Sequence, residues 1–323
     1  MNGAWDIWSA CTPRCARHAV PPVPAAEAAR RGAAFARAVR RALAVRGTPA
    51  DGGRPPDPAL LRAHARALLT ALGIRLETAD GGLRVPAGGA PGAVRGDVPR
   101  RAAPGAERPG GPGTLVVANH ISWLDILALL AVEPVTLLAK REVGGWPVVG
   151  GLARSAGTHF IDRTSPRQLP YTVGELTELL GAGHSVAVFP QATTWCTAAQ
   201  GTFRRATFQA AIDAGAPVRP VTLTYTQHTR PSTVAAFCGT DTFVASLRRV
   251  LTARGLTVRV AAHPGLPAGP DRRTLAALAR TAVMGEAPRP VWDVPAVPCP
   301  PVDGARVPEP APAPASQIPG TYL

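Results

Sequence analysis

Short hydrophobic blocks alternate with amphipathic stretches along the middle of the chain, from residue 114 onward. The apolar blocks have the length of buried strands, and the stretches between most of them carry apolar residues at helical spacing. The predicted strands are 114–119, 135–139, 158–161, 185–189, 217–225 and 256–262. The predicted helices are 123–132, 145–155, 169–182, 204–214, 240–254 and 271–284. This alternation predicts an α/β domain in which helices flank a largely parallel central sheet.

A helix predicted over residues 25–46 has one apolar and one basic face. The apolar face carries Phe35, Val39, Ala42 and Leu43, and the opposite face carries Arg30, Arg37, Arg40 and Arg41. A basic amphipathic helix of this kind can lie on a membrane interface. It can equally pack on the domain with its arginines in solvent, and the sequence leaves both interpretations open.

A second N-terminal helix has clear end signals. Asp57 is a suitable N-cap, Pro58 suits the first helical position, and Gly73 follows the end. Its buried stripe is expected to consist of Leu61, Ala65, Leu68 and Leu72. A hairpin is predicted next, with strands 74–78 and 83–85 joined by an Asp80-Gly81 turn.

The composition limits how much of the chain folds. The chain holds 36 Pro and 33 Gly among 323 residues, concentrated outside its middle. We expect disordered Pro-rich ends at 1–24 and 287–323 and a flexible linker at 87–113. The N-terminal helices and hairpin then occupy 25–86, and the main α/β domain occupies 114–286.

The formal net charge of +14 favours anionic partners. A nucleic-acid partner is not indicated, because the arginines are scattered along the chain and no groove-reading or base-stacking motif is present. An anionic membrane surface is the better match. No stretch reaches the roughly 18 apolar residues that a membrane span requires. We therefore expect peripheral attachment to the inner face of the cell membrane, in the cytoplasm.

The five cysteines give little sign of a metal site. Cys11 and Cys15 are the only close pair, and Cys-x3-Cys without a second pair is poor evidence for zinc. No metal-ligand set is predicted. An odd number of cysteines and no secretory signal indicate a reducing, cytoplasmic compartment. Cys196 is interpreted as a small packing residue rather than a nucleophile.

His120 and Asp125 stand where a predicted strand ends and a helix begins. Five positions along a regular helix correspond to about 500°, which would leave the two side chains about 140° apart. They can meet only if His120 lies on the turn before the helix. An imidazole held by a carboxylate is suited to proton transfer. The alternative is that Asp125 caps the helix from its third position, with Ser122 as N-cap, and His120 is incidental.

Four more polar clusters follow later strands. In order, the motifs are Asn119-His120-x4-Asp125, Ala-Lys-Arg-Glu-Val at 139–143 with Trp-Pro at 146–147, Gly-Thr-x-Phe-Ile-Asp-Arg at 157–163, Phe-Pro-x-x-Thr at 189–193 and Pro-Val-x-Pro-Val at 217–221. This series resembles the glycerolipid acyltransferases, and more narrowly the bacterial 1-acylglycerol-3-phosphate acyltransferases and their lyso-ornithine-lipid relatives. The resemblance covers roughly residues 60–285.

The resemblance implies transfer of an acyl group from acyl-CoA or acyl-carrier protein to the hydroxyl of a lysophospholipid, most simply 1-acylglycerol-3-phosphate. His120 would be the general base and Asp125 its orienting partner, and no cofactor is needed because the thioester is already activated. Arg163 and Lys140 would contact the phosphate of the substrate. Asn119, Gln191, Ala192 and Thr193 complete the expected substrate-binding set. Ordinary surface roles for Lys140 and Arg163 remain open.

The chain departs from the family pattern at one place. Gln191 and Ala192 stand where relatives have Glu and Gly, so a carboxylate is lost, and alanine restricts the backbone and bars close approach or positive φ. This departure predicts weaker activity or a changed acceptor. It leaves two alternatives, a lyso-ornithine-lipid acyltransferase and a non-catalytic lipid-binding homologue.

Overall fold

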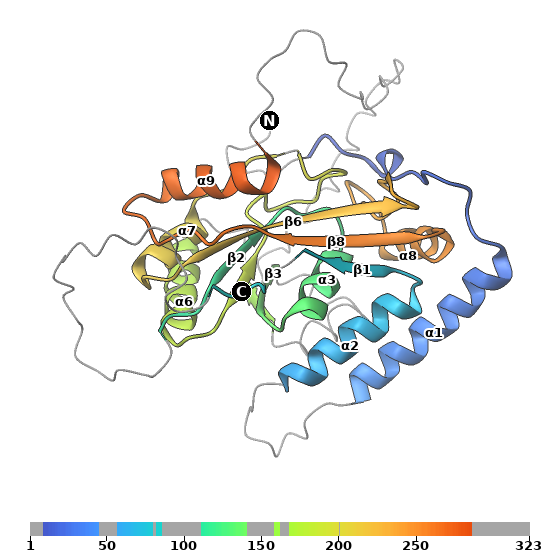
Figure 1. The fold of residues 1–323 in the computed structure, drawn as a ribbon, viewed down its shortest axis with the longest axis horizontal. Coiled ribbons are helices and arrows are strands. Elements are labelled where there is room, and N and C mark those ends of the chain that lie inside the picture. The colour runs from blue at the N-terminus through green and yellow to red at the C-terminus, as the bar shows by residue number, and fades with distance from the viewer. Residues whose placement is uncertain are drawn as a thin grey trace, which may run out of the picture. The chain divides into compact units, whose positions relative to one another are not determined.

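An eight-stranded mixed sheet is the centre of the computed structural model (Figure 1). The structure describes residues 9–44, 57–79, 82–85, 111–140, 158–161, 168–199 and 201–285, all within one compact unit. The strands are β1 (Arg75–Thr78), β2 (Leu115–Ala118), β3 (Thr136–Lys140), β4 (His159–Ile161), β5 (Val186–Val188), β6 (Val218–Gln227), β7 (Arg230–Pro231) and β8 (Leu256–Ala262). Their order is β1-β8-β6-β2-β5-β3-β4, with β7 paired to β6.

The strand directions confirm the predicted, largely parallel sheet. β2 is parallel to both β5 and β6, β3 is parallel to both β4 and β5, and β1 is parallel to β8. Only β8 and the short β7 run antiparallel to β6. The carboxyl ends of β2, β5, β3 and β4 therefore lie at one edge of the sheet, where sites gather in folds of this type.

Helices cover both faces of this sheet. They are α1 (Ala25–Ala44), α2 (Pro58–Ala71), α3 (Leu124–Val132), α6 (Leu169–Gly181), α7 (Ala206–Asp213), α8 (Phe243–Thr252) and α9 (Arg272–Met284), with a short 3₁₀ turn, η1, at Pro13–Cys15. Side chains alternate along β2, so Val116 packs with the core under α1, α2 and α3 while Val117 packs with the core under α6, α7 and α9. In Figure 1, α2 and α9 accordingly lie on opposite sides of the strands.

Most predicted elements are present within one to three residues of their expected bounds, but the hairpin is wrong. β1 pairs in parallel with β8, which lies far along the chain, instead of forming a hairpin with residues 83–85. The residues 83–85 form no strand; the Leu83 N–H donates to Glu133 Oε2 at 2.7 Å, and the Leu83 side chain is buried. The Asp80-Gly81 turn and the helix predicted at 145–155 lie outside the described residues.

The expectation that residues 1–24 are disordered is wrong for the described part of that segment. Residues 9–24 run along the domain, and the side chains of Cys11 and Val23 are buried. Backbone and side-chain hydrogen bonds fix the segment: Val23 N donates to Thr252 O at 2.9 Å, and Ala19 N donates to Gln227 Oε1 at 2.8 Å. Composition alone missed this, since a chain with little regular structure can still be held by long-range contacts.

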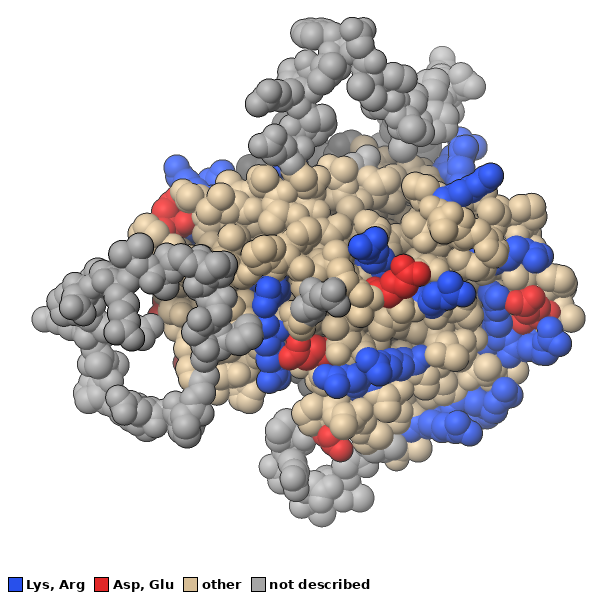
Figure 2. All heavy atoms as spheres, in the orientation of Figure 1, with Lys and Arg blue, Asp and Glu red and all other residues tan. Residues whose placement is uncertain are grey.

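The helix α1 packs on the domain with its arginines in solvent. Phe35, Val39 and Ala42 are buried, and α1 packs against α2 and α8. The four predicted arginines of the opposite face are exposed, and Figure 2 shows Lys and Arg side chains along the α1 and α2 side of the face in view. The apolar face of α1 is thus used within the protein. In the described part of the chain, no helix combines the length and apolar character needed to span a bilayer.

Candidate active site

His120 and Asp125 meet across the turn that joins β2 to α3. β2 ends at Ala118 and α3 begins at Leu124, so His120 lies on the turn before the helix. The angle of about 140° that a regular helix would set between the two side chains therefore does not apply. The imidazole Nδ1 lies 2.9 Å from Asp125 Oδ2. The His120 side chain is 20% exposed, whereas the Asp125 side chain is fully buried. A buried carboxylate therefore holds a ring whose other edge reaches the surface.

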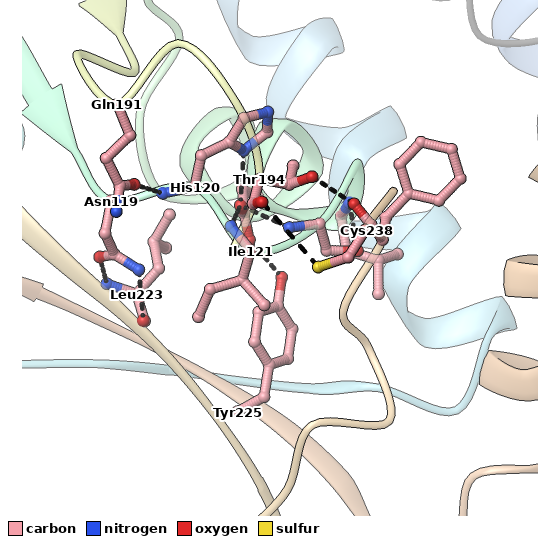
Figure 3. Close-up of polar contacts among 12 residues, drawn as sticks. Asn119, His120, Ile121, Gln191, Thr194, Leu223, Tyr225 and Cys238 are labelled. Atoms are coloured by element: carbon pink, nitrogen blue, oxygen red, sulfur yellow. Dashed lines mark hydrogen bonds and ion pairs between the residues drawn. The ribbon is translucent and has the colours of Figure 1, made fainter. Parts of the chain in front are cut away.

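Four groups converge on the Asp125 carboxylate (Figure 3). Oδ2 accepts the backbone N–H groups of Ile121 at 2.7 Å and Ser122 at 2.9 Å in addition to the His120 contact. Oδ1 accepts the hydroxyl of Tyr225 at 2.6 Å. One carboxylate thus both fastens the turn before α3 and contacts the ring.

These contacts determine which ring nitrogen of His120 carries the proton. A carboxylate only accepts hydrogen bonds, so we assign the proton to Nδ1, which donates to Asp125. The Nε2 atom then carries the lone pair. Within the described part of the chain no hydrogen bond reaches Nε2, and Figure 3 shows the second ring nitrogen pointing away from the carboxylate. The exposed edge of the ring is therefore the edge that can accept a proton.

Tyr225 is a site residue that sequence reasoning missed. It lies on β6, where buried and half-buried residues alternate, and its side chain is on the buried face. Burial, followed by the nearby Asp125 carboxylate, raises the pKa of Tyr225 well above its usual value. The hydroxyl is therefore a hydrogen-bond donor throughout the neutral range. The sequence did contain one signal for it, a tyrosine at a position predicted to be buried in a strand. A buried hydroxyl requires a hydrogen-bond partner, so such a tyrosine indicates a nearby polar group.

The segment after β5 holds His120 in place. Gln191 Oε1 accepts the backbone N–H of His120 at 2.5 Å, and the His120 carbonyl accepts the N–H of Trp195 at 2.9 Å. The Phe189 ring stacks on the imidazole, with centroids 4.0 Å apart and planes 15° apart. Gln191 is itself buried. This segment therefore fixes both the backbone and the ring plane of His120.

The Asn119 side chain is bonded within the protein, and its predicted substrate contact stays a prediction. Its side chain is fully buried. Nδ2 donates to the Leu223 carbonyl at 3.0 Å, and Oδ1 accepts the Leu223 N–H at 2.7 Å. The amide thus continues the pairing of β2 with β6 by one residue beyond the strand end. Asn119 therefore sets where His120 begins its turn.

The remaining predicted residues are only partly described. The backbone of Lys140 ends β3 and pairs with Ile161 of β4, at the same sheet edge as the segment after β5. Arg163 lies outside the described residues, as does the side chain of Lys140, so their phosphate contacts stay predictions. Thr193 is half-buried on the segment after β5.

Comparison with known proteins agrees with this geometry. The family model described as Acyltransferase matches residues 98–224, which include β2, the turn with His120 and Asp125, and the first part of β6. The lyso-ornithine lipid O-acyltransferase of Rhodobacter capsulatus is 34% identical over 185 residues, covering 54% of this chain and 67% of that protein. The chain belongs to the acyltransferase family.

Other acyltransferases extend the comparison. The 1-acyl-sn-glycerol-3-phosphate acyltransferase of Neisseria meningitidis is 40% identical over 157 residues, which cover 49% of this chain and 61% of that protein. The chain thus spans about three fifths of that relative's length. The crystal structure of the 1-acyl-sn-glycerophosphate acyltransferase PlsC from Thermotoga maritima has the same fold, with a TM-score of 0.50, 17% identity, and coverage of 77% of this chain and 86% of that chain.

Ala192 adopts the backbone conformation that glycine favours. Its φ is 60°, in the left-handed region, whereas we expected alanine to exclude positive φ. Its N–H donates to the Phe189 carbonyl at 3.0 Å and closes the turn. A non-glycine residue in this conformation costs about 1–2 kcal/mol. The contacts of Gln191 and Trp195 with His120 maintain a strained turn beside the imidazole.

Three other residues near the site take structural positions. Trp123 packs on Phe35 and Phe243, and its indole N–H donates to Ser246 Oγ at 3.1 Å. Burial, followed by neighbouring thiols, raises the pKa of Cys196 and raises that of Cys238 to about 12. Both thiols are therefore protonated at neutral pH in the absence of a metal, and neither is a thiolate nucleophile.

Proposed function

We propose that this acyltransferase moves an acyl group from acyl-CoA or acyl-carrier protein to the free hydroxyl of a lysophospholipid, with His120 as general base. The observation that carries the proposal is the Nδ1 contact of His120 with the buried Asp125, which leaves Nε2 on the exposed edge. The family membership supports the reaction type. No serine or cysteine nucleophile is required, because the donor thioester is already activated.

The proposed step is direct. The lysolipid hydroxyl oxygen attacks the thioester carbon as Nε2 of His120 takes the hydroxyl proton. The carbon–oxygen bond forms, the carbon–sulfur bond breaks, and the proton passes to the departing thiolate. The Asp125 carboxylate stabilises the imidazolium that exists between these two proton transfers. Base assistance of this kind contributes about 10²- to 10⁴-fold to the rate.

The acceptor is proposed to be 1-acylglycerol-3-phosphate, with Arg163 and Lys140 near its phosphate. An assay with a labelled acyl thioester and a panel of lysolipids identifies the acceptor. Arg163→Ala should raise the KM for lysophosphatidate by at least about 10-fold, because a charge-assisted phosphate contact contributes roughly 1.5–3 kcal/mol. Arg230→Ala, which removes an exposed arginine from β7, is the control. An unchanged KM in Arg163→Ala would exclude the phosphate contact.

Lyso-ornithine lipid is the second candidate acceptor, and it is favoured by the similarity to the Rhodobacter capsulatus enzyme. That acceptor carries no phosphate. If it is the substrate, the same panel should show turnover with lyso-ornithine lipid and little effect of Arg163→Ala. The two candidates therefore separate in one experiment.

The Gln191-Ala192 pair distinguishes a weakened enzyme from a non-catalytic lipid-binding homologue. Gln191→Glu with Ala192→Gly keeps an oxygen acceptor for the His120 N–H and relieves the strained φ. We expect about a 10-fold gain in kcat/KM, since a carboxylate held at the His120 backbone N–H favours the imidazolium formed during transfer by about 1.4 kcal/mol. Ala192→Gly alone is the control, and it should raise stability in urea by about 0.5–1 kcal/mol without that gain. Liposome binding without turnover in every variant would establish the non-catalytic homologue.

Peripheral attachment to an anionic membrane, on its cytoplasmic face, is proposed through the exposed arginines of α1. Their attraction to acidic lipid contributes about 1 kcal/mol per side chain near the surface and is screened by salt. The variant Arg37→Glu/Arg41→Glu should sediment less with vesicles containing phosphatidylserine at low salt. Arg272→Glu/Arg273→Glu, at the exposed start of α9, is the matched control. Equal loss in both pairs, or no vesicle binding by the wild type, would contradict the role of α1.

A further inference from the structure

Cysteine side chains gather beside the active site although they are distant in the sequence. Cys11, Cys15 and Cys196 place their sulfur atoms within 4.8 Å of one another, and Cys11 Sγ lies 3.4 Å from Cys196 Sγ. Cys238 lies beside this group but outside the set of sulfur atoms within 4.8 Å of one another; its buried thiol interacts with Cys11 and lies 3.9 Å from the Thr194 carbonyl. Three of the five cysteines in the chain therefore form one cluster, and a fourth adjoins it.

The surrounding backbone is built to hold this cluster. Cys15 ends the 3₁₀ turn η1, and its carbonyl accepts the Thr233 hydroxyl at 2.6 Å. The backbone N–H of Cys196 points to Cys11 Sγ at 3.4 Å. Gly239, at φ 60°, passes so close to Cys11 that an added Cβ would lie 3.1 Å from the Cys11 carbonyl oxygen. Three segments with little regular structure are thus packed tightly around sulfur.

We infer that Cys11, Cys15 and Cys196 bind one zinc ion in a structural site, and that the adjoining Cys238 moves in as the fourth ligand when the metal binds. Zinc in such sites is tetrahedral with Zn–S bonds of about 2.3 Å, which places sulfur atoms about 3.8 Å apart. The distances of 3.4 Å and up to 4.8 Å within the first three cysteines bracket that value. The Cys-x3-Cys spacing of the first pair falls in the usual range for zinc sites. The second pair comes from residues 196 and 238, which is why sequence spacing concealed the site.

The chemistry of binding balances without an oxidant. Zn²⁺ forms four Zn–S bonds, and the four thiols release four protons, which leaves a site with a net charge of −2. Arg14 and Arg17 flank Cys15 in the sequence. Arg249, which is ion-paired with Asp241 at 2.6 Å, donates to the Ala236 carbonyl at 2.7 Å on the segment that leads to Cys238. A disulfide would join only two sulfurs, so it accounts less well for three within 4.8 Å of one another and a fourth beside them.

The zinc site would stabilise the turn that carries His120 and Ile121. Phe237, next to Cys238, donates its N–H to the Ile121 carbonyl at 2.9 Å, and Trp195, next to Cys196, donates to the His120 carbonyl at 2.9 Å. The Thr194 hydroxyl donates to the Phe237 carbonyl. The metal would therefore join the N-terminal segment to the two loops that contact His120 and Ile121. This role is structural and independent of the acyl acceptor.

Metal analysis of the full-length chain tests the inference. The protein is produced in zinc-supplemented medium, purified with a reductant and without chelator, and measured by inductively coupled plasma mass spectrometry. We expect one zinc per chain in the wild type and in Cys299→Ser, and loss of the zinc in Cys11→Ser and in Cys196→Ser. A metal-free wild type, or unchanged zinc in those two variants, would overturn the site.

A second measurement covers the case in which a cysteine variant does not fold. X-ray absorption of the zinc-loaded wild type should give four sulfur neighbours at about 2.3 Å. Cobalt exchanged into the wild type should show the thiolate charge-transfer bands of a tetrahedral site. Nitrogen or oxygen neighbours in place of any sulfur would overturn the four-cysteine assignment. So would a disulfide between any two of the four, detected by mass spectrometry of the non-reduced protein.

Discussion

Replacing His120 with alanine should lower kcat by about 10²- to 10⁴-fold while the protein stays folded. The variant removes the Nε2 acceptor on the exposed edge of the ring. It leaves Asp125 with three donors, the N–H groups of Ile121 and Ser122 and the Tyr225 hydroxyl. The loss in stability should therefore be about 1 kcal/mol. Thiol release from an acyl thioester in the presence of lysolipid measures the rate, and urea unfolding measures the stability.

The matched control for this variant is His184→Ala. His184 is exposed and lies on the turn before β5, away from Asp125. Its loss should leave both kcat and the unfolding midpoint unchanged. A His120→Ala enzyme that retained wild-type turnover would remove His120 as the base. Equal damage from both substitutions would point to a general effect of losing a histidine.

The regular elements were predictable because their signals are local. Asp57 caps α2 by accepting the Ala59 N–H at 2.9 Å. Along β6, buried and half-buried residues alternate because the two faces of the strand have different surroundings. The turn after β2 was also local, since His120 and Asp125 are five residues apart.

What the sequence could not reveal depends on contacts between distant residues. Tyr225 reaches Asp125 across 100 positions, and Cys11 reaches Cys196 across 185. The pairing of β1 with β8 is of the same kind, and a nearby turn signal suggested a hairpin instead. The hydrophobic periodicity of the sequence does not indicate such long-range contacts, because they follow from the order of strands in the sheet.

Replacing Asp125 with asparagine should lower kcat by up to roughly 10³-fold and cost only about 1–2 kcal/mol in stability. Three donors converge on the Oδ2 position, so the amide oxygen of the variant is expected to take that place and the Nδ1–H tautomer of His120 is kept. The amide NH₂ then faces Tyr225, whose hydroxyl can turn and accept. What is lost is the negative charge beside the imidazolium, which is worth about 4 kcal/mol at 4 Å in a protein-like dielectric. Asp213→Asn, which changes an exposed carboxylate at the end of α7, is the control.

Tyr225→Phe provides the graded comparison that identifies the important group. It removes one neutral donor from the Asp125 carboxylate and keeps the charge and the three contacts of Oδ2. Turnover should therefore fall less than about 10-fold, in line with the roughly 1 kcal/mol of a single neutral hydrogen bond. The expected order of damage to kcat is His120→Ala, then Asp125→Asn, then Tyr225→Phe. If Tyr225→Phe were as inactive as Asp125→Asn, the buried hydroxyl would be the needed group, and the carboxylate charge would lose its proposed role.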